Sequence, residues 1–394
     1  MISFQEAQNM VLQHSKPLTP IDTSLAETMG LVLAEDQYSP LDLPPFDQSN
    51  MDGYAFRYAD LVELSSLAIV GSIPAGSPRP ASLGRGEAAR IFTGAPVPKG
   101  ADTVVAQEKV KADGKSLTIL DESLVLGNNI RPCGAEMEKG KLAMPKMTRL
   151  SPAGLGFLAS MGIDRVKIFP KPKISLIITG KEIQQIGKSL LPGQVYDSNS
   201  LMLAASLSFM QPTDLKTVFV DDELSQVEQA IAEALDSSTV VLLTGGVSVG
   251  DYDFVAQAAT LNGVSTLFHQ VKQKPGKPLY FGKKGETLVF GLPGNPSSVL
   301  TCFYIYVLPA LEKIMAFRDT SRSIWLPLGK PVKKTFSLTQ FLKGWLQDGM
   351  VIPLDAQESY RLSSFARANC LICLPETEHE FAEGTLVEVY LIPA

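Results

Sequence analysis

The chain has 394 residues, of which 45% are hydrophobic and 19% are charged, and its formal net charge is −6. A chain of this length can bury several cores, so two to four domains are expected, and the composition argues against extensive disorder. The acidic balance, without any block of lysines and arginines, argues against nucleic acid or an anionic membrane as the partner, but it leaves room for a locally basic site that binds a small anion.

Neither the cysteines, the histidines nor the N-terminus points to a disulfide-rich, zinc-binding or secreted protein. Four cysteines are too few for a disulfide framework in a chain of this length, and the three histidines are scattered. Cys370 and Cys373 form a CxxC pair inside an apolar run, so a buried strand explains them better than metal or redox chemistry. The N-terminus lacks the basic and apolar parts of a signal peptide, and no uncharged apolar run approaches membrane-spanning length. We therefore expect a cytoplasmic protein.

Residues 1–168 are expected to form an N-terminal region that contains an inserted β-rich domain. Ser3 and Glu6 form a capping box before a helical pattern. A proline-marked stretch at 39–46 cannot be helical and indicates an extended linker. After it, short strand-like runs alternate with glycine and proline turns, which is typical of a small all-β domain. We place this insertion at about 46–146.

The region 169–318 has the pattern of a doubly wound, mostly parallel α/β domain. Continuous apolar or β-branched runs alternate there with long helical patterns, and strands buried on both faces with helical crossovers form parallel sheets. The tail, 319–394, returns to short strands and turns, which predict a small β-barrel. The fold class is therefore multidomain, α+β and α/β. The four apolar runs are Ile174–Ile178, Lys216–Val220, Val240–Leu243 and Leu288–Gly291.

Four polar, glycine-rich loops lie within the α/β domain, most of them directly after a predicted strand. In open α/β sheets, ligands bind beyond the carboxyl ends of the strands, where helix N-termini present free amides. A plain turn explains any one loop about as well, but four such loops in one domain predict an anion site. The loops are Thr179–Glu182, Thr244–Asp253, Lys274–Pro278 and Gly291–Ser298.

Two of these loops offer backbone groups to an anion. The consecutive glycines Gly245 and Gly246 let backbone amides approach an anion closely. Ser297 or Ser298 could cap the last long helix while its dipole points at a phosphate.

The charged residues of the loops suit the same ligand. Lys274 and Lys277 flank a Pro-Gly turn, so both ammonium groups can meet one oxyanion. Asp251 and Glu182 could hold a divalent cation that bridges to phosphate oxygens.

The last three loops occur together with other segments in an order that is specific to one family. The further segments are Ser49–Ala55, Ile91–Pro96, Asn129–Arg131 and Gln194–Asn199. With them, the chain resembles the molybdopterin molybdenumtransferases, and the resemblance covers essentially its whole length.

The resemblance implies an enzyme of molybdenum cofactor biosynthesis. Such an enzyme takes adenylylated molybdopterin and molybdate, releases AMP and leaves molybdenum on the dithiolene, with Mg²⁺ as the cofactor. By analogy, molybdate binds at Lys274, Lys277 and Pro278, while Glu182 and Asp251 bind the metal and serve the hydrolytic step. The residues implied for pterin phosphate and nucleotide are Gly245, Gly246, Ser248, Gly250, Gly294, Asn295, Pro296 and Ser297.

The resemblance also implies a homodimer in which the N-terminal region of one subunit closes the cleft of the other. Asp52 in this region is then a catalytic residue, and Thr93 and Arg131 bind the cofactor, as does Asn199 of the α/β domain. A further implied partner is the adenylyltransferase that makes the substrate.

Several of these residues have simpler explanations. Asp52 and the glycine after it could form a type I′ hairpin turn, and Thr93 could belong to another turn. Arg131 could make an ordinary surface salt bridge, and Asp197 and Asn199 could cap the helix that follows them.

Three motifs depart from the family pattern. Lys181 stands where Thr-Gly-Asp-Glu has an acid, and this charge reversal would weaken a carboxylate metal cage. Ala135 and Glu136 replace a Glu-Asp pair, and Lys343 replaces the arginine of Phe-x-Arg, which turns a two-pronged donor into a point charge if the position touches molybdate. The alternative function is therefore a catalytically weakened pterin- or molybdate-binding carrier on the same scaffold.

Overall fold

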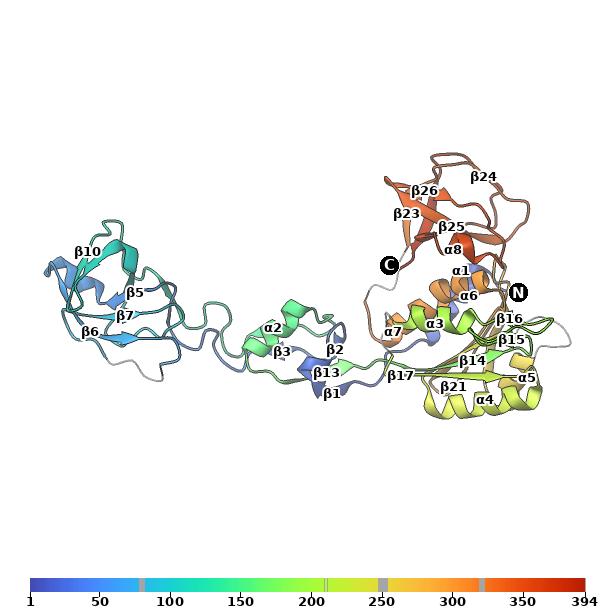
Figure 1. Cartoon of the computed structure of the whole chain (residues 1–394), viewed down its shortest axis with the longest axis horizontal. Helices are drawn as coiled ribbons and strands as arrows, with labels where there is room; N and C mark the ends of the chain where they lie inside the picture. The colour runs from blue at the N-terminus through green and yellow to red at the C-terminus, as the bar shows by residue number, and fades with distance from the viewer. Residues whose placement is uncertain (78–81, 209, 211, 247–253, 319–322, 394) are drawn as a thin grey trace. The chain divides into compact units, whose positions relative to one another are not determined.

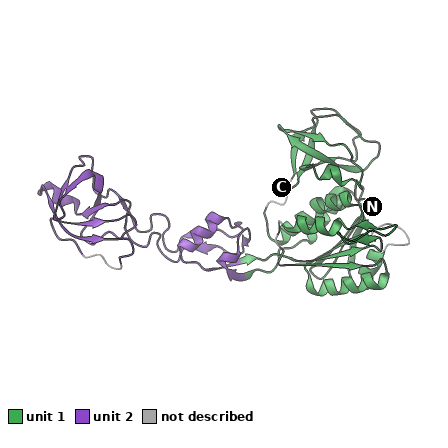
Figure 2. Ribbon diagram, viewed as in Figure 1, with its two compact units in different colours: residues 1–21, 168–394 green, residues 22–167 purple. Residues whose placement is uncertain are grey.

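The computed structural model of the chain describes residues 1–77, 82–208, 210, 212–246, 254–318 and 323–393. The chain forms two compact units, which Figures 1 and 2 show. Unit 1 comprises residues 1–21 and 168–394, and unit 2 comprises residues 22–167. Unit 2 is therefore a single insertion into the sequence of unit 1.

Unit 1 is built on a six-stranded sheet in which four strands are parallel. The sheet order is β17-β14-β18-β22-β21-β19. β21 pairs antiparallel with both β22 and β19, and the other neighbours pair in parallel. Each of the four predicted runs falls on one of the four parallel strands. β14, β18 and β22 are buried, as continuous apolar sequence predicts, whereas the edge strand β17 is exposed or partly exposed along its length. The strands are β14 (Lys173–Thr179), β17 (Asp214–Val220), β18 (Val240–Thr244), β19 (Ser265–Gln270), β21 (Pro278–Lys284) and β22 (Thr287–Leu292).

Helices cover both faces of this sheet, which makes the domain doubly wound (Figure 1). α4 and α5 bury their apolar residues on one face, and α3 and α6 pack together on the other. α1 packs against α7 and the π-helical turn Phe303–Val307. The helices are α1 (Phe4–His14), α3 (Asn199–Ser208), α4 (Leu224–Ser237), α5 (Phe254–Leu261), α6 (Pro296–Cys302) and α7 (Leu308–Ile314).

α6, the π-helical turn and α7 form one helical run, Pro296–Ile314. Among the described residues, it is the one helix whose length and hydropathy would suit a membrane span, although the sequence had suggested no such segment. Its apolar window is 89% buried within the structure, as expected for the central helix of a folded domain.

The C-terminal part of unit 1 is a second, curled sheet of order β20-β25-β27-β29-β23, with β26 paired to β25. A bridge between Leu328 and Val351 brings the two ends of the sheet toward closure. β27 is buried throughout, so Cys370 and Cys373 are strand residues in a core, and burial raises the pKa of Cys370 to about 12. The elements are β20 (Gln273–Lys274), β23 (Ser323–Pro327), β25 (Thr339–Gln347), β26 (Met350–Pro353), α8 (Leu362–Phe365), β27 (Cys370–Leu374) and β29 (Leu386–Leu391), with the separate pair β24 (Val332–Lys333) and β28 (Glu380–Phe381).

Unit 2 contains the expected β-rich domain, a six-stranded sheet of order β8-β5-β7-β6-β10-β9 with two small apolar cores. Its strands are β5 (Gly53–Phe56), β6 (Leu67–Ile73), β7 (Glu87–Ile91), β8 (Thr103–Ala106), β9 (Val110–Ala112) and β10 (Ser116–Ile119). The remaining elements are β1 (Ile21–Ser24), β2 (Val32–Leu33), β3 (Gln37–Tyr38), β4 (Gln48–Ser49), β11 (Ile130–Arg131), β12 (Leu142–Met144), α2 (Pro152–Ser160) and β13 (Arg165–Phe169).

Candidate functional site

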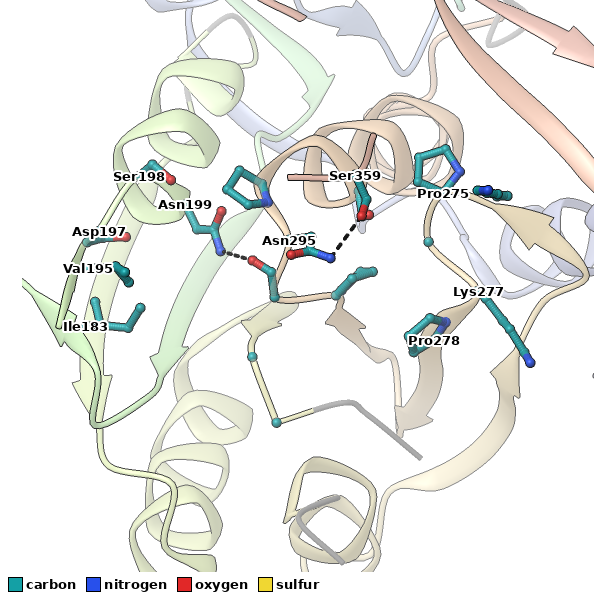
Figure 3. A pocket seen from close by; sticks show the side chains of 18 of the residues that line it. Ile183, Val195, Asp197, Ser198, Asn199, Pro275, Lys277, Pro278, Asn295 and Ser359 are labelled. Atoms are coloured by element: carbon teal, nitrogen blue, oxygen red, sulfur yellow. Dashed lines mark hydrogen bonds between the residues drawn. The ribbon is translucent and has the colours of Figure 1, made fainter. Parts of the chain in front are cut away.

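A pocket of about 840 Å³ lies in unit 1 where the parallel strands end (Figure 3). β14, β18 and β22 run in parallel register, so that Ile178, Thr244 and Leu292 lie side by side and the loops after them start together. The C-terminal sheet adds a wall from the loop after β26. The lining residues used below are Glu182, Asp197, Asn199, Gly245, Gly246, Lys274, Lys277, Pro278, Gly294, Asn295, Pro296, Ser298, Gln357 and Ser359.

The turn after β18 requires glycine. Gly245 and Gly246 have φ values of +86° and +61°, in the left-handed region that side chains disfavour. A Cβ on Gly245 would lie 2.6 Å from both the carbonyl oxygen and Oγ1 of Thr179. The turn therefore has no room for side chains, and its two glycines line the pocket.

Two buried oxygens beside this turn have no hydrogen-bond partner among the described residues. They are Oγ1 of Thr179 and Oδ1 of Asp222, and the latter lies 3.9 Å from the place of a Cβ on Gly246. Asp222 was not among the residues predicted for the site. Its position directly after the predicted strand Lys216–Val220 was the available signal, because acids at carboxyl ends of parallel strands face the ligand edge.

The first turn of α6 is fixed by neighbouring loops (Figure 3). Asn199 Nδ2 donates to the carbonyl oxygen of Gly294 at 3.0 Å, and Asn295 Nδ2 donates to Oγ of Ser359 at 3.0 Å. The N-cap of α6 is Asn295, so the prediction that Ser297 or Ser298 caps this helix is wrong. Ser297 is buried in the first turn, and its amide donates to the carbonyl oxygen of Ser359 at 3.2 Å.

Asp197 caps the start of α3, which was the simpler explanation offered for this residue above. Its Oδ1 accepts from the amide of Ser200 at 3.0 Å, which satisfies a free amide of the first helical turn. Asn199, by contrast, connects α3 to the Gly294 loop and does not cap its own helix. Both residues also line the pocket.

The two lysines of the Lys274–Pro278 turn are exposed and line the pocket. Lys274 Nζ lies 4.3 Å from the centre of the Phe336 ring, which is a cation–π distance. Lys277 carries its ammonium group on the other side of the turn from Pro275 (Figure 3). The lining of the pocket therefore includes two lysines as well as the bare glycine turn, which suits an anionic ligand.

Lys181 is paired with an acid outside the pocket lining. Its Nζ lies 3.0 Å from Oε1 of Glu223, and this contact raises the pKa of Lys181 and lowers that of Glu223. Both side chains are exposed, so the pair contributes little to stability. The pair directs the positive charge of Lys181 toward the acids that follow β17. The next residue, Glu182, lines the pocket.

Lys343 is buried and holds a loop together. It is 3% exposed, and its Nζ donates to the carbonyl oxygens of Ala356, Glu358 and Arg361 at 2.8, 3.3 and 3.1 Å. Burial lowers the pKa of its ammonium group. All of its hydrogens have protein acceptors, so Lys343 positions the loop that carries Ser359 and is not placed to touch molybdate.

In unit 2, Asp52 and Thr93 are in direct contact. The amide and the hydroxyl of Thr93 donate to Oδ1 of Asp52 at 2.9 and 2.8 Å, and both bonds lower the pKa of the carboxyl group. Arg131 lies on β11, which pairs with β4 just before Asp52. Gly53 begins β5 and has no positive φ, so the hairpin-turn explanation for Asp52 is wrong. A Cβ on Gly53 would lie 1.9 Å from the carbonyl oxygen of Val105, which explains the glycine by packing.

The carboxylates near the pocket fit a hard divalent cation only in part. Within the described ranges, no group of three or more His, Cys, Asp and Glu side chains could hold a metal ion. Glu182 and the unpartnered Oδ1 of Asp222 are the oxygen donors on the described side of the turn. Ser248, Gly250 and Asp251 lie outside the described residues.

Three family profiles match the chain in order. They are the MoeA N-terminal region (domain I and II) at residues 2–162, the probable molybdopterin binding domain at 177–313, and the MoeA C-terminal region (domain IV) at 326–392.

Relatives that match over nearly their whole length are named molybdopterin molybdenumtransferases. The chain is 31% identical to the molybdopterin molybdenumtransferase of Haemophilus influenzae over 99% of this chain and 98% of the relative. It is 36% identical to that of Nostoc sp. over 92% and 87%, respectively. The solved molybdopterin biosynthesis MoeA protein of Pyrococcus horikoshii has a TM-score of 0.86 and 31% identity over 100% of both chains. The predicted multidomain fold class is thereby confirmed.

The Asp52–Thr93 contact predicts a titration. We expect the carboxyl group of Asp52 to titrate below the usual range of aspartate, and Thr93→Val to raise its pKa while leaving it depressed, because the amide donor remains. The folded-state pKa lies below the unfolded value, so the stability that this contact contributes is present above the unfolded pKa and is lost as the pH falls through the folded one. NMR titration of the aspartate carboxyl carbons measures the pKa directly.

Asp113 is the internal control in the same titration. Its pKa is also lowered by backbone donors, Lys115 and Ser116, which Thr93→Val does not touch. An Asp52 midpoint that stays in place in the variant would contradict the assigned contact.

Lys343→Met predicts a loss of stability. The change leaves three carbonyl oxygens of the loop without their donor, and we expect it to lower the free energy of unfolding by about 2–3 kcal/mol. Lys333→Met is the matched control, because Lys333 is an exposed lysine of the same domain with a single surface salt bridge to Glu380. Urea unfolding compares the two. Equal, small losses would show that Lys343 does not hold the loop.

Proposed function

The chain belongs to the MoeA family of molybdopterin molybdenumtransferases, and we propose that it inserts molybdenum from molybdate into adenylylated molybdopterin with release of AMP. The observation that supports this most is the pocket itself, which is lined by a bare glycine turn, two lysines and two acidic side chains. A substrate with a phosphoanhydride and a tetrahedral oxyanion needs that combination of groups.

In this proposal, different loops bind different parts of the two substrates. Amides of the Gly245–Gly246 turn, with Ser248 and Gly250 after it, receive the pterin phosphate and nucleotide together with the 294–297 loop. Lys274, Lys277 and Pro278 receive molybdate. Holding both substrates in one cleft replaces an encounter of two free anions, and this orientation lowers the barrier to transfer.

Mg²⁺ is the proposed cofactor, and Glu182, Asp222 and Asp251 are the carboxylates that would hold it. When bound, it would supply neutralisation of charge on the phosphoanhydride oxygens. Asp222 adds an acid that the sequence reading had not included, and its unpartnered Oδ1 is the reason for including it. Lys181 pairs with Glu223, and its charge also acts on Asp222, so this ammonium group lies near one of the acids proposed for Mg²⁺.

Asp52, Thr93 and Arg131 complete the site in our proposal from the partner subunit of a cytoplasmic homodimer. Within unit 2, two donors from Thr93 favour the ionised form of the Asp52 carboxyl group, and Arg131 lies on β11, which pairs with β4. The adenylyltransferase that makes the substrate is the further proposed partner.

The test is AMP release from adenylylated molybdopterin in the presence of Mg²⁺ and molybdate. We expect Asp251→Asn to lower the rate on the order of 100-fold while substrate binding remains, because the change removes one carboxylate charge with little change of shape. Asp236→Asn is the control, since Asp236 is an exposed acid of α4 outside the pocket lining.

A carrier protein on the same scaffold gives a different result. The wild-type chain would then bind the pterin nucleotide tightly and release no AMP under conditions in which another family member does.

A further inference from the structure

The Lys274–Lys277 turn rests on a buried side-chain amide, that of Gln273. This residue is 0% exposed. Its Nε2 lies 3.2 Å from the carbonyl oxygens of both Pro275 and Gly276, to which it donates, and 3.6 Å from Sγ of Cys302. A buried amide is tolerated only when its groups are paired, and here the pairing is with the turn itself.

The acceptor side of the same amide is held from the central helix. The hydroxyl of Tyr306, which is also 0% exposed, donates to Oε1 of Gln273. This bond fixes which way the amide faces, because an oxygen bound to Tyr306 turns the NH₂ group toward the two carbonyls. Tyr306 belongs to the π-helical turn between α6 and α7, so the orientation of the amide depends on a rigid element.

The turn has little room to move against this support. Gly276 has a φ of +85°, and a Cβ there would lie 2.5 Å from Sγ of Cys302 and 2.9 Å from Nε2 of Gln273. Burial raises the pKa of Cys302 to about 12 and holds the pKa of Tyr306 well above its usual value, so both groups are neutral at physiological pH. The cluster therefore acts through shape and hydrogen bonding and carries no charge of its own.

The two lysines leave this fixed turn at either end. Gln273 and Lys274 form β20, which pairs with Thr339 and Gln340 of β25 in the C-terminal sheet. At the other end, the carbonyl oxygen of Lys277 accepts from the amide of Val271 at 3.0 Å. With both ends and the middle held, the distance between the starting points of the two lysine side chains is set before any ligand arrives.

We propose that Gln273, oriented by Tyr306, is a positioning residue that sets the spacing of Lys274 and Lys277 and thereby the affinity of the pocket for a tetrahedral dianion. The inference rests on the proposed function, in which these lysines receive molybdate. Preorganisation of the turn saves the ordering that binding would otherwise require, so loss of the amide weakens molybdate binding and leaves binding of the pterin nucleotide, which uses other loops, unchanged.

Equilibrium dialysis of molybdate against the full chain tests the proposal. Gln273→Met keeps the side-chain length and removes the amide, and we expect it to weaken molybdate binding on the order of 10-fold or more. Tyr306→Phe, which only releases the orientation of the amide, should weaken it less. Affinity for adenylylated molybdopterin should stay at the wild-type value in both, a selectivity that general damage to the fold would not give.

Tyr280→Phe is the matched control. It removes a hydroxyl from another tyrosine that is 0% exposed, but that hydroxyl bonds with Thr266, 3.1 Å away, and not with the turn. Molybdate binding should be unaffected. Wild-type molybdate affinity in folded Gln273→Met, or an equal loss for molybdate and the pterin nucleotide, would overturn the proposal. If Gln273→Met does not fold, the same comparison is decided by Tyr306→Phe.

A second readout separates this inference from the proposed function. If the wild-type chain binds no molybdate, the proposed function fails, and hydrogen exchange of peptides covering residues 271–279 in the ligand-free chain still tests the support of the turn. Faster exchange in Gln273→Met and Tyr306→Phe than in Tyr280→Phe supports it. The same exchange in all three variants overturns it.

Discussion

The parallel register of β14, β18 and β22 is the constraint on which the rest of unit 1 depends. Because Ile178, Thr244 and Leu292 lie side by side, the loops after these strands emerge at one edge and enclose one pocket. The buried, continuous apolar sequence of the strands requires helices on both faces, and those helices begin at the same edge. The position of the site is thus a consequence of how the core is buried.

Polar contacts then fix the loops to one another. Asn199 ties α3 to the loop before α6, Asn295 ties that loop to Ser359, and Lys343 holds the segment from which Ser359 projects. Asn199 and Lys343 are buried side chains that satisfy backbone carbonyl groups of loops, which is how irregular segments become rigid, whereas Asn295 is exposed and bonds to a side-chain hydroxyl. The pocket of a proposed transferase therefore has walls from both the α/β domain and the C-terminal sheet.

The parallel strands and the positions of the loops could be predicted from the sequence, because they follow local patterns of apolar residues and glycines. The four apolar runs predicted the parallel strands. The anion site in the glycine-rich loops stays a prediction, although the structure shows that the turn at Gly245 and Gly246 requires glycine. The antiparallel pairing of β19 with β21, the loop contacts of Lys343 and the support by Gln273 depend on contacts between distant segments, which no local pattern encodes. The N-cap at Asn295 did have a local signal, because Pro296 stands at the first helical position. The domain limits at 168 and 318 and the roles of Ser248, Gly250 and Asp251 stay predictions.

The central claim is that the loops at this edge form one site for molybdate and a pterin nucleotide. Anomalous diffraction from crystals of the full chain soaked in molybdate tests it most directly, because molybdenum scatters anomalously and its position needs no assumption about activity. The account predicts a single strong peak in the pocket, within hydrogen-bond reach of the ammonium group of Lys277 or Lys274 and next to Pro278. A peak only on the outer surface of the protein, or none in the pocket at saturating molybdate, would contradict it.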